Sequence, residues 1–206
     1  YGQILAAMPP ETDAEGIWNI AWVRDGAYAI SGMVESGHMT MARDALDFML
    51  KDRAVGKTNK YKCADTGLLV DYHISVVRYF GDGEEESDFC GDPGYCPGNS
   101  KPCGAEGSNV EWDDFGLFLW AYCTYKNAGG ADVGGYWATN SVKPANALVS
   151  LIDGNNILKQ DSSIWERHWG TWNPPITAYQ GSANPPTSTA GKRQFAYSSI
   201  CGYKGL

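Results

Sequence analysis

The chain has 206 residues, 43% of them hydrophobic, so we expect one sizeable folded domain and not a disordered chain. Its net charge is −8 and its pI about 4.8, and an acidic surface argues against nucleic acid and anionic membranes as partners. No apolar run approaches the length of a membrane span. Because the sequence begins at Tyr1 and not at Met, we interpret it as a mature, processed or partial chain.

The first third of the chain predicts two helices and a strand. Residues 1–22 are rich in turn-forming residues and predict an extended lead-in. Apolar residues then recur at helical spacing over 23–35 and over 38–51. Residues 52–68 are polar and predict a loop. The segment 70–83 partly alternates and is rich in β-branched and aromatic residues, so it predicts a strand, one arm of a small β-hairpin.

Residues 81–108 predict a surface insertion that is rich in Gly, Pro and Cys. A zinc site favours closely spaced cysteine pairs with a nearby histidine, and the cysteine loop has no histidine. Disulfides fit better, and they imply an oxidising compartment, so we expect a secreted or periplasmic protein. The candidate disulfide cysteines are Cys63, Cys90, Cys96 and Cys103. Cys123 and Cys201 lie in apolar helical patterns, which predicts buried free thiols.

The insertion opens with an acidic run, GDGEEESD, over residues 81–88. Carboxylates at this density are one way to hold a structural Ca²⁺. A solvated loop is the alternative, and we favour it because acidic runs usually stay in water. No other cofactor is expected.

The second half of the chain predicts three further helices, over 112–126, over 137–152 and from Gln194 to the end. Pro144 falls inside the second of these patterns, which predicts a later start or a kink. Residues 162–192 are too rich in Pro, Gly and Ser for a long regular element.

Three clusters that combine a tryptophan with carboxylates lie at or just before the starts of apolar helices. Capping and helix-dipole complementarity explain any one of them. Three together favour an aromatic, acidic pocket, and the 13% aromatic content fits sugar stacking about as well as an aromatic core. The clusters are AWVRDG (Trp22, Arg24, Asp25), VEWDDFG (Glu111, Trp112, Asp113, Asp114) and IWERHW (Trp165, Glu166, Arg167).

Glu166 stands between two tryptophans and after a serine-rich turn, in SSIWERHWG. Indole rings strip solvent from a carboxylate and raise its pKa, which suits a catalytic acid near neutral pH. The alternative is a capping box, with Ser162 or Ser163 at the N-cap and Glu166 three residues on.

In order and spacing, the three clusters resemble motifs of glycoside hydrolase family 15, the glucoamylase-like enzymes. GQILAAMPPETDAEGIWNIAWVRDGAYAISGMVESGH resembles the family's opening segment with its W-x-R-D motif, NVEWDDFGLFLWA resembles its second active-site segment, and SSIWERHW resembles its L-W-E-E motif. The resemblance implies an all-α fold, an (α/α)6 barrel of which residues 1–206 supply about half, with the β-hairpin and Cys-rich insertion as an addition.

The family's site residues carry over one by one. Glu166 matches the general acid, while Arg24 and Asp25 match the pair that holds the hydroxyls of the terminal glucose. Arg167 replaces the second Glu of the family motif, so recognition on the leaving-group side is expected to differ. The remaining substrate-binding candidates are Trp22, Trp112, Asp114 and Trp165.

The resemblance therefore implies an inverting exo-acting α-glucosidase that releases glucose from α-glucans or α-gluco-oligosaccharides. Inversion needs a second carboxylate as base, which in the family lies in the second half of the barrel. That half is expected from the same gene product or from a second chain. Two alternatives remain: a non-catalytic glucoamylase-like regulatory or sugar-binding module, and an unrelated helical sugar-binding protein.

Overall fold

The computed structural model describes residues 2–6, 20–51, 60–62, 69–80, 83, 111–159, 161, 164 and 194–206. Within them the helices are α1 (Val23–Glu35), α2 (Met39–Leu50), α3 (Asp113–Asn127), α4 (Tyr136–Ser150) and α6 (Ala196–Gly205). The strands are β1 (Ile20–Trp22), β2 (Lys60–Lys62), β3 (Leu69–Asp71) and β4 (Arg78–Phe80). The described residues are thus mainly helical, as predicted. The closed barrel stays a prediction.

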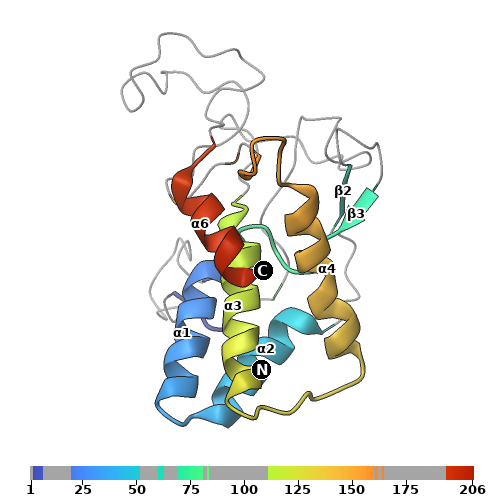
Figure 1. Ribbon diagram of the computed structural model, residues 1–206. Helices are drawn as coiled ribbons and strands as arrows, with labels where there is room; N and C mark the ends of the chain where they lie inside the picture. The colour runs from blue at the N-terminus through green and yellow to red at the C-terminus, as the bar shows by residue number, and fades with distance from the viewer. Residues whose placement is uncertain are drawn as a thin grey trace, which may run out of the picture.

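Helix α3 lies at the centre of the described helices and contacts α1, α2, α4 and α6 (Figure 1). Its side chains are buried on nearly every face, including Phe115, Phe118 and Ala121. A helix that is apolar all round is typical of a core element and not of a surface helix. The segment that opens α3 is therefore anchored in the middle of the described helices.

Glycines let α6 approach α3 closely. A Cβ atom added to Gly116 of α3 would lie 2.1 Å from the carbonyl oxygen of Cys201, and one added to Gly205 would lie 2.3 Å from the carbonyl oxygen of Gly116. Real Cβ atoms never come so near to backbone atoms, so only glycine fits at these two positions.

Polar groups connect α2 to α4 at the other side of the core. Asp47 accepts hydrogen bonds from Tyr136 Oη and, at 2.9 Å, from Trp137 Nε1. The backbone carbonyl of Leu50, at the end of α2, accepts from Asn140 Nδ2 at 2.8 Å. The last carbonyls of a helix have no partner within the helix, so α4 supplies one from its side chains.

The prediction of one continuous strand over 70–83 is wrong, although its first residues do pair antiparallel with the preceding strand, as the arm of a hairpin does. Strands β3 and β4 are short and belong to different sheets, since β3 pairs with β2 and β4 pairs with β1, both antiparallel. Between them the chain is irregular: His73 has φ 64°, and Tyr79 Oη accepts a hydrogen bond from the amide of Ser75 at 2.7 Å. All side chains from Tyr72 to Val77 are buried, so the apolar residues are enclosed on both sides and need no alternation.

The helix boundaries lie within a residue or two of those predicted. Helix α4 begins at Tyr136 and continues through Pro144 to Ser150, so the predicted later start does not occur. Among the described residues, none of the helices is both long and apolar enough to cross a membrane.

Two of the six cysteines lie in the described part of the chain. Cys123 and Cys201 are both free, as predicted. Cys201 is buried, but Cys123 is exposed, contrary to the prediction; its neighbours Tyr122 and Thr124 are only half-buried, so this turn of α3 is open to solvent. The four candidate disulfide cysteines and the acidic run other than Gly83 lie outside the described residues.

Candidate functional site

Arg24, in the first turn of α1, joins that helix to the segment that opens α3. Its Nη1 atom donates to Glu111 Oε2 and, at 3.0 Å, to Asp113 Oδ2. The Arg24 side chain is 15% exposed, whereas both carboxylate side chains are 0% exposed. The structure thus brings together the first two predicted clusters, which lie 87 and 89 residues apart at these contacts.

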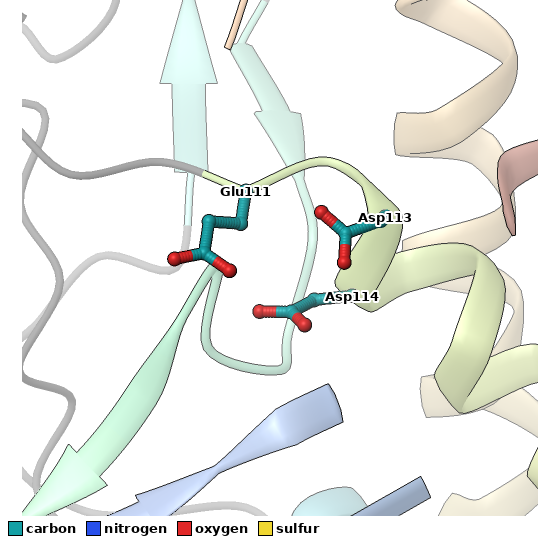
Figure 2. Close-up of side chains that lie close together, drawn as sticks. All are labelled: Glu111, Asp113 and Asp114. Carbon is teal, nitrogen blue, oxygen red and sulfur yellow. The ribbon is translucent and has the colours of Figure 1, made fainter. Parts of the chain in front are cut away.

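Glu111, Asp113 and Asp114 form an acidic cluster, and we keep this name for these three residues. One carboxylate oxygen from each lies within 4.8 Å of the others. Glu111 comes from the segment that enters α3, Asp113 and Asp114 come from its first turn, and the three side chains face a common space (Figure 2). All three residues are buried, with at most 1% of their surface exposed.

Backbone hydrogen bonds fix the segment that carries the acidic cluster. The amide of Glu111 donates to the carbonyl of Val76 at 2.9 Å, and the amide of Trp112 donates to Asp161 Oδ2 at 3.0 Å. The first amides of a helix lack partners within the helix and carry partial positive charge. Carboxylates at this position are therefore favoured, and the two residues that precede α3, Glu111 and Trp112, are held from two sides.

The pKa values of Arg24, Asp113 and Asp114 are all raised, which favours the charged form of Arg24 and the neutral form of the two carboxyls. Burial opposes the charge of Arg24, but the attraction of Asp114, Glu111 and Asp113 outweighs it and raises the pKa of Arg24 above its ordinary value. Burial raises the pKa of Asp114 well above 3.8, and repulsion from Asp113 and Glu111 acts in the same direction. Burial likewise raises the pKa of Asp113, although Arg24 opposes that change.

Asp161 is a fourth buried carboxylate beside the acidic cluster. It is 0% exposed, and burial, followed by repulsion from Asp113, raises its pKa well above 3.8. Its hydrogen bond to the Trp112 amide acts in the opposite direction. Asp161 therefore joins the residues that precede Ser162 to the start of α3.

The other predicted site residues lie in different settings. Trp22 is half-buried and precedes α1, with the Arg78 guanidinium 5.4 Å from its ring centroid. Asp25 is exposed. Trp112 is 0% exposed and packs beside Phe115, with ring centroids 5.8 Å apart. Direct contact of Trp112 or Asp114 with a sugar therefore stays a prediction, because neither presents an open face here.

The third cluster, Trp165, Glu166 and Arg167, lies outside the described residues. Its convergence with Arg24 and Asp114 remains a prediction.

Sequence reasoning assigned no role to three residues of this site. Glu111 and Asp113 were visible in the VEWDDFG cluster, but only the structure shows that they, and not Asp114, contact Arg24. Asp161 stands five positions before Glu166, and nothing in the sequence marked it as a partner of Trp112.

Comparison with known proteins finds similar folds among solved structures but no similar sequence. No family model matches the sequence, and no curated protein sequence matches it. Among solved structures, the chain is similar to one described as "Glycosidase E178A", at 17% identity and a TM-score of 0.50, and to "Glycosidase Y48F" and "Glycosidase E335A in complex with glucose", each at 18% and 0.50. Each match covers 81% of this chain and 39% of the other.

The described helices and the matches together define a helical, glycosidase-like fold. The chain spans well under half of the length of each glycosidase that it matches.

Proposed function

We propose that this chain supplies part of the active site of an inverting exo-acting α-glucosidase of glucoamylase type. The observation that carries the proposal is the contact of Arg24, at the start of α1, with Glu111 and Asp113, at the start of α3. Two of the three motif clusters thus meet where two helices begin. The glycosidase-like fold supports the same function.

In this proposal Glu166 is the general acid that protonates the glycosidic oxygen. Arg24 and Asp25 hold hydroxyl groups of the terminal glucose, and the solvent-facing part of Arg24 is suited to that task. Trp22, Trp165 and Arg167 line the sugar site. Trp112 and Asp114 hold the residues of the sugar site in position without touching the sugar, because both are buried. The base that activates water lies outside this chain.

The substrate in this proposal is an α-glucan or an α-gluco-oligosaccharide. The protein is secreted or periplasmic, and its loop cysteines are paired in disulfides. The remainder of the barrel comes from the same gene product or a second chain.

The test compares Glu166→Gln with wild type in the complete protein that contains this chain. Turnover of maltose should fall by about 10²–10⁴-fold, because the amide cannot deliver a proton. Turnover of α-glucosyl fluoride should fall far less, since its leaving group needs no proton. Glu35→Gln, at the exposed end of α1, is the matched control and should leave both rates unchanged.

The anomer of the released glucose is read by NMR, and an inverting enzyme gives β-glucose first. Equal losses on the two substrates would remove Glu166 from the role of acid. Sugar binding by the wild type without turnover of either substrate would favour the non-catalytic sugar-binding module.

A further inference from the structure

Asp114 is a buried carboxylate at the start of α3. It is 1% exposed, and neither of its carboxylate oxygens has a hydrogen-bond partner among the described residues. Buried polar groups nearly always have a partner, and a bare carboxylate is among the most costly to bury. The position therefore calls for a positively charged or proton-bearing group that none of the described side chains supplies.

The geometry of the acidic cluster matches a cation of calcium size. Ca²⁺ binds oxygen at about 2.3–2.6 Å, so two of its ligands lie at most about 5.2 Å apart. One oxygen each from Glu111, Asp113 and Asp114 fall within 4.8 Å of one another. The three carboxylates also face a common space (Figure 2), so they can reach one ion without a change of backbone.

The charge of the site fits a divalent ion. The three carboxylates of the acidic cluster and the guanidinium of Arg24 leave two negative charges when all are ionised, and Asp161 beside them adds negative charge. Arg24 contacts one oxygen of Glu111 and one of Asp113, and each carboxylate has a second oxygen. All of the donors are oxygen, which selects hard cations over zinc or copper.

A sugar is a poorer occupant of this position. A hexose needs an open cavity, whereas all three residues of the acidic cluster are at most 1% exposed. A cation needs only the space between the oxygens. Ca²⁺ accepts irregular sets of oxygen ligands, whereas Mg²⁺ demands a near-ideal octahedron and usually keeps several water molecules. Carboxylate oxygens that are fixed by buried side chains at a helix start therefore suit Ca²⁺ better.

We propose that Glu111, Asp113 and Asp114 bind one divalent oxygen-seeking cation, Ca²⁺ in preference to Mg²⁺, at the start of α3. The ion stabilises the junction of α1 and α3 and is separate from the acidic run over residues 81–88. The proposal does not depend on the proposed glucosidase activity.

The test measures Ca²⁺ binding to the full chain by isothermal titration calorimetry after treatment with chelator. The wild type should bind Ca²⁺ with a stoichiometry near one ion per chain. Asp114→Asn should weaken the affinity for Ca²⁺ at least tenfold. Tb³⁺ serves as a second probe, since Trp112 lies between two of the ligands in the sequence and should sensitise its emission. That emission should disappear in Asp114→Asn.

The matched control changes Glu84, Glu85 and Glu86 to Gln, which removes the same kind of charge from the acidic run. This variant should keep both the calorimetric site and the Tb³⁺ emission. Loss of binding in this variant, with binding retained in Asp114→Asn, would overturn the proposal, as would the absence of any binding at millimolar Ca²⁺.

Thermal unfolding provides a readout that is independent of activity. Ca²⁺ at a hundredfold excess over the wild-type Kd should raise the Tm of the wild type by about 5–10 °C. At the same Ca²⁺ concentration the Tm of Asp114→Asn should rise by no more than about half as much, since its affinity is at least tenfold weaker. Without Ca²⁺ the variant should be at least as stable as the wild type, because it loses an unpaired charge. If Asp114→Asn does not fold, Glu111→Gln replaces it, and binding that Glu111→Gln leaves intact overturns the proposal.

Discussion

The Nη1 atom of Arg24 lies 3.0 Å from Oδ2 of Asp113, and this contact joins the first turns of α1 and α3. Asp113 is 0% exposed, so its charge has little access to water. A buried carboxylate that loses its cation is strongly destabilising, because desolvation is no longer offset. The contact is therefore structural as well as part of the candidate site.

Arg24→Ala should lower the free energy of unfolding by about 3 kcal/mol or more, since it leaves buried carboxylates without their cation. Arg24→Lys should lower it less, because Lys keeps the charge but not the planar set of donors. Arg43→Ala is the control, since Arg43 pairs with Asp44 at the surface, and it should change stability little. Urea denaturation at pH 7 measures all three. Similar losses for Arg24→Ala and Arg43→Ala would contradict a structural role for the Arg24 contact.

Gly116→Ala should disrupt the packing of α6 on α3. The added Cβ would lie 2.1 Å from the carbonyl oxygen of Cys201, so the helices must separate, at a cost of about 1–3 kcal/mol or more. Gly32→Ala in α1 is the matched control, because a Cβ there meets nothing within 4 Å. It should stabilise the protein by about 0.5–1 kcal/mol. The two Tm values should therefore move in opposite directions, and a rise for both would show that α6 does not pack as described.

Asp161 should tolerate replacement by asparagine, which keeps a hydrogen-bond acceptor, but not by alanine, which has none. Asp161→Ala leaves the buried amide of Trp112 without its partner, which should cost about 1–3 kcal/mol. Asp161→Asn keeps an oxygen for that amide and removes a buried charge, so it should be neutral or stabilising. Chemical denaturation of the two variants measures the difference, and equal destabilisation would mean that the Trp112 hydrogen bond contributes nothing.

The stability of the protein without metal should fall as the pH rises above about 4. The pKa of Asp114 is raised well above 3.8 in the folded state, so the folded state binds more protons than the unfolded state between those two pKa values. By linkage, the free energy of unfolding then decreases with pH across that window and levels off above the folded pKa. Asp161 contributes in the same direction, because its pKa is raised too.

Asp114→Asn should flatten this pH dependence, measured as Tm between pH 4 and pH 8 in the presence of chelator. Asp132→Asn, which removes a surface partner of Lys126, is the control and should leave the slope unchanged. An unchanged slope in Asp114→Asn would contradict the raised pKa of Asp114.

The two described cysteines should react with a thiol reagent at different rates. Cys123 is exposed and Cys201 is buried, and burial raises the pKa of the Cys201 thiol, which makes the reactive thiolate scarcer. One thiol should react in the native protein and a second only after unfolding. Four or more free thiols in the unfolded, unreduced protein would contradict the predicted disulfides of the insertion.

The spacing of apolar residues along the sequence was enough to predict most of the helices. Apolar spacing placed α1 and α2 within a residue or so of their observed bounds, because amphipathic helices bury one face and so repeat every three to four residues. The same reasoning failed between β3 and β4, where Tyr72 to Val77 are all buried. A segment enclosed on both sides has no polar face to reveal its conformation.

The sequence by itself determined which residue types stand at the helix starts, namely Arg24 in one cluster and Glu111, Trp112, Asp113 and Asp114 in another. Only the tertiary structure decided which of them meet. Arg24 contacts Glu111 and Asp113, whereas the side-chain oxygens of Asp114 have no hydrogen-bond partner among the described residues. Asp161, from a later part of the chain, accepts from the Trp112 amide. These contacts join residues 49 to 89 positions apart. Charge, burial and hydrogen bonding over such separations depend on how helices pack, and no local periodicity encodes them.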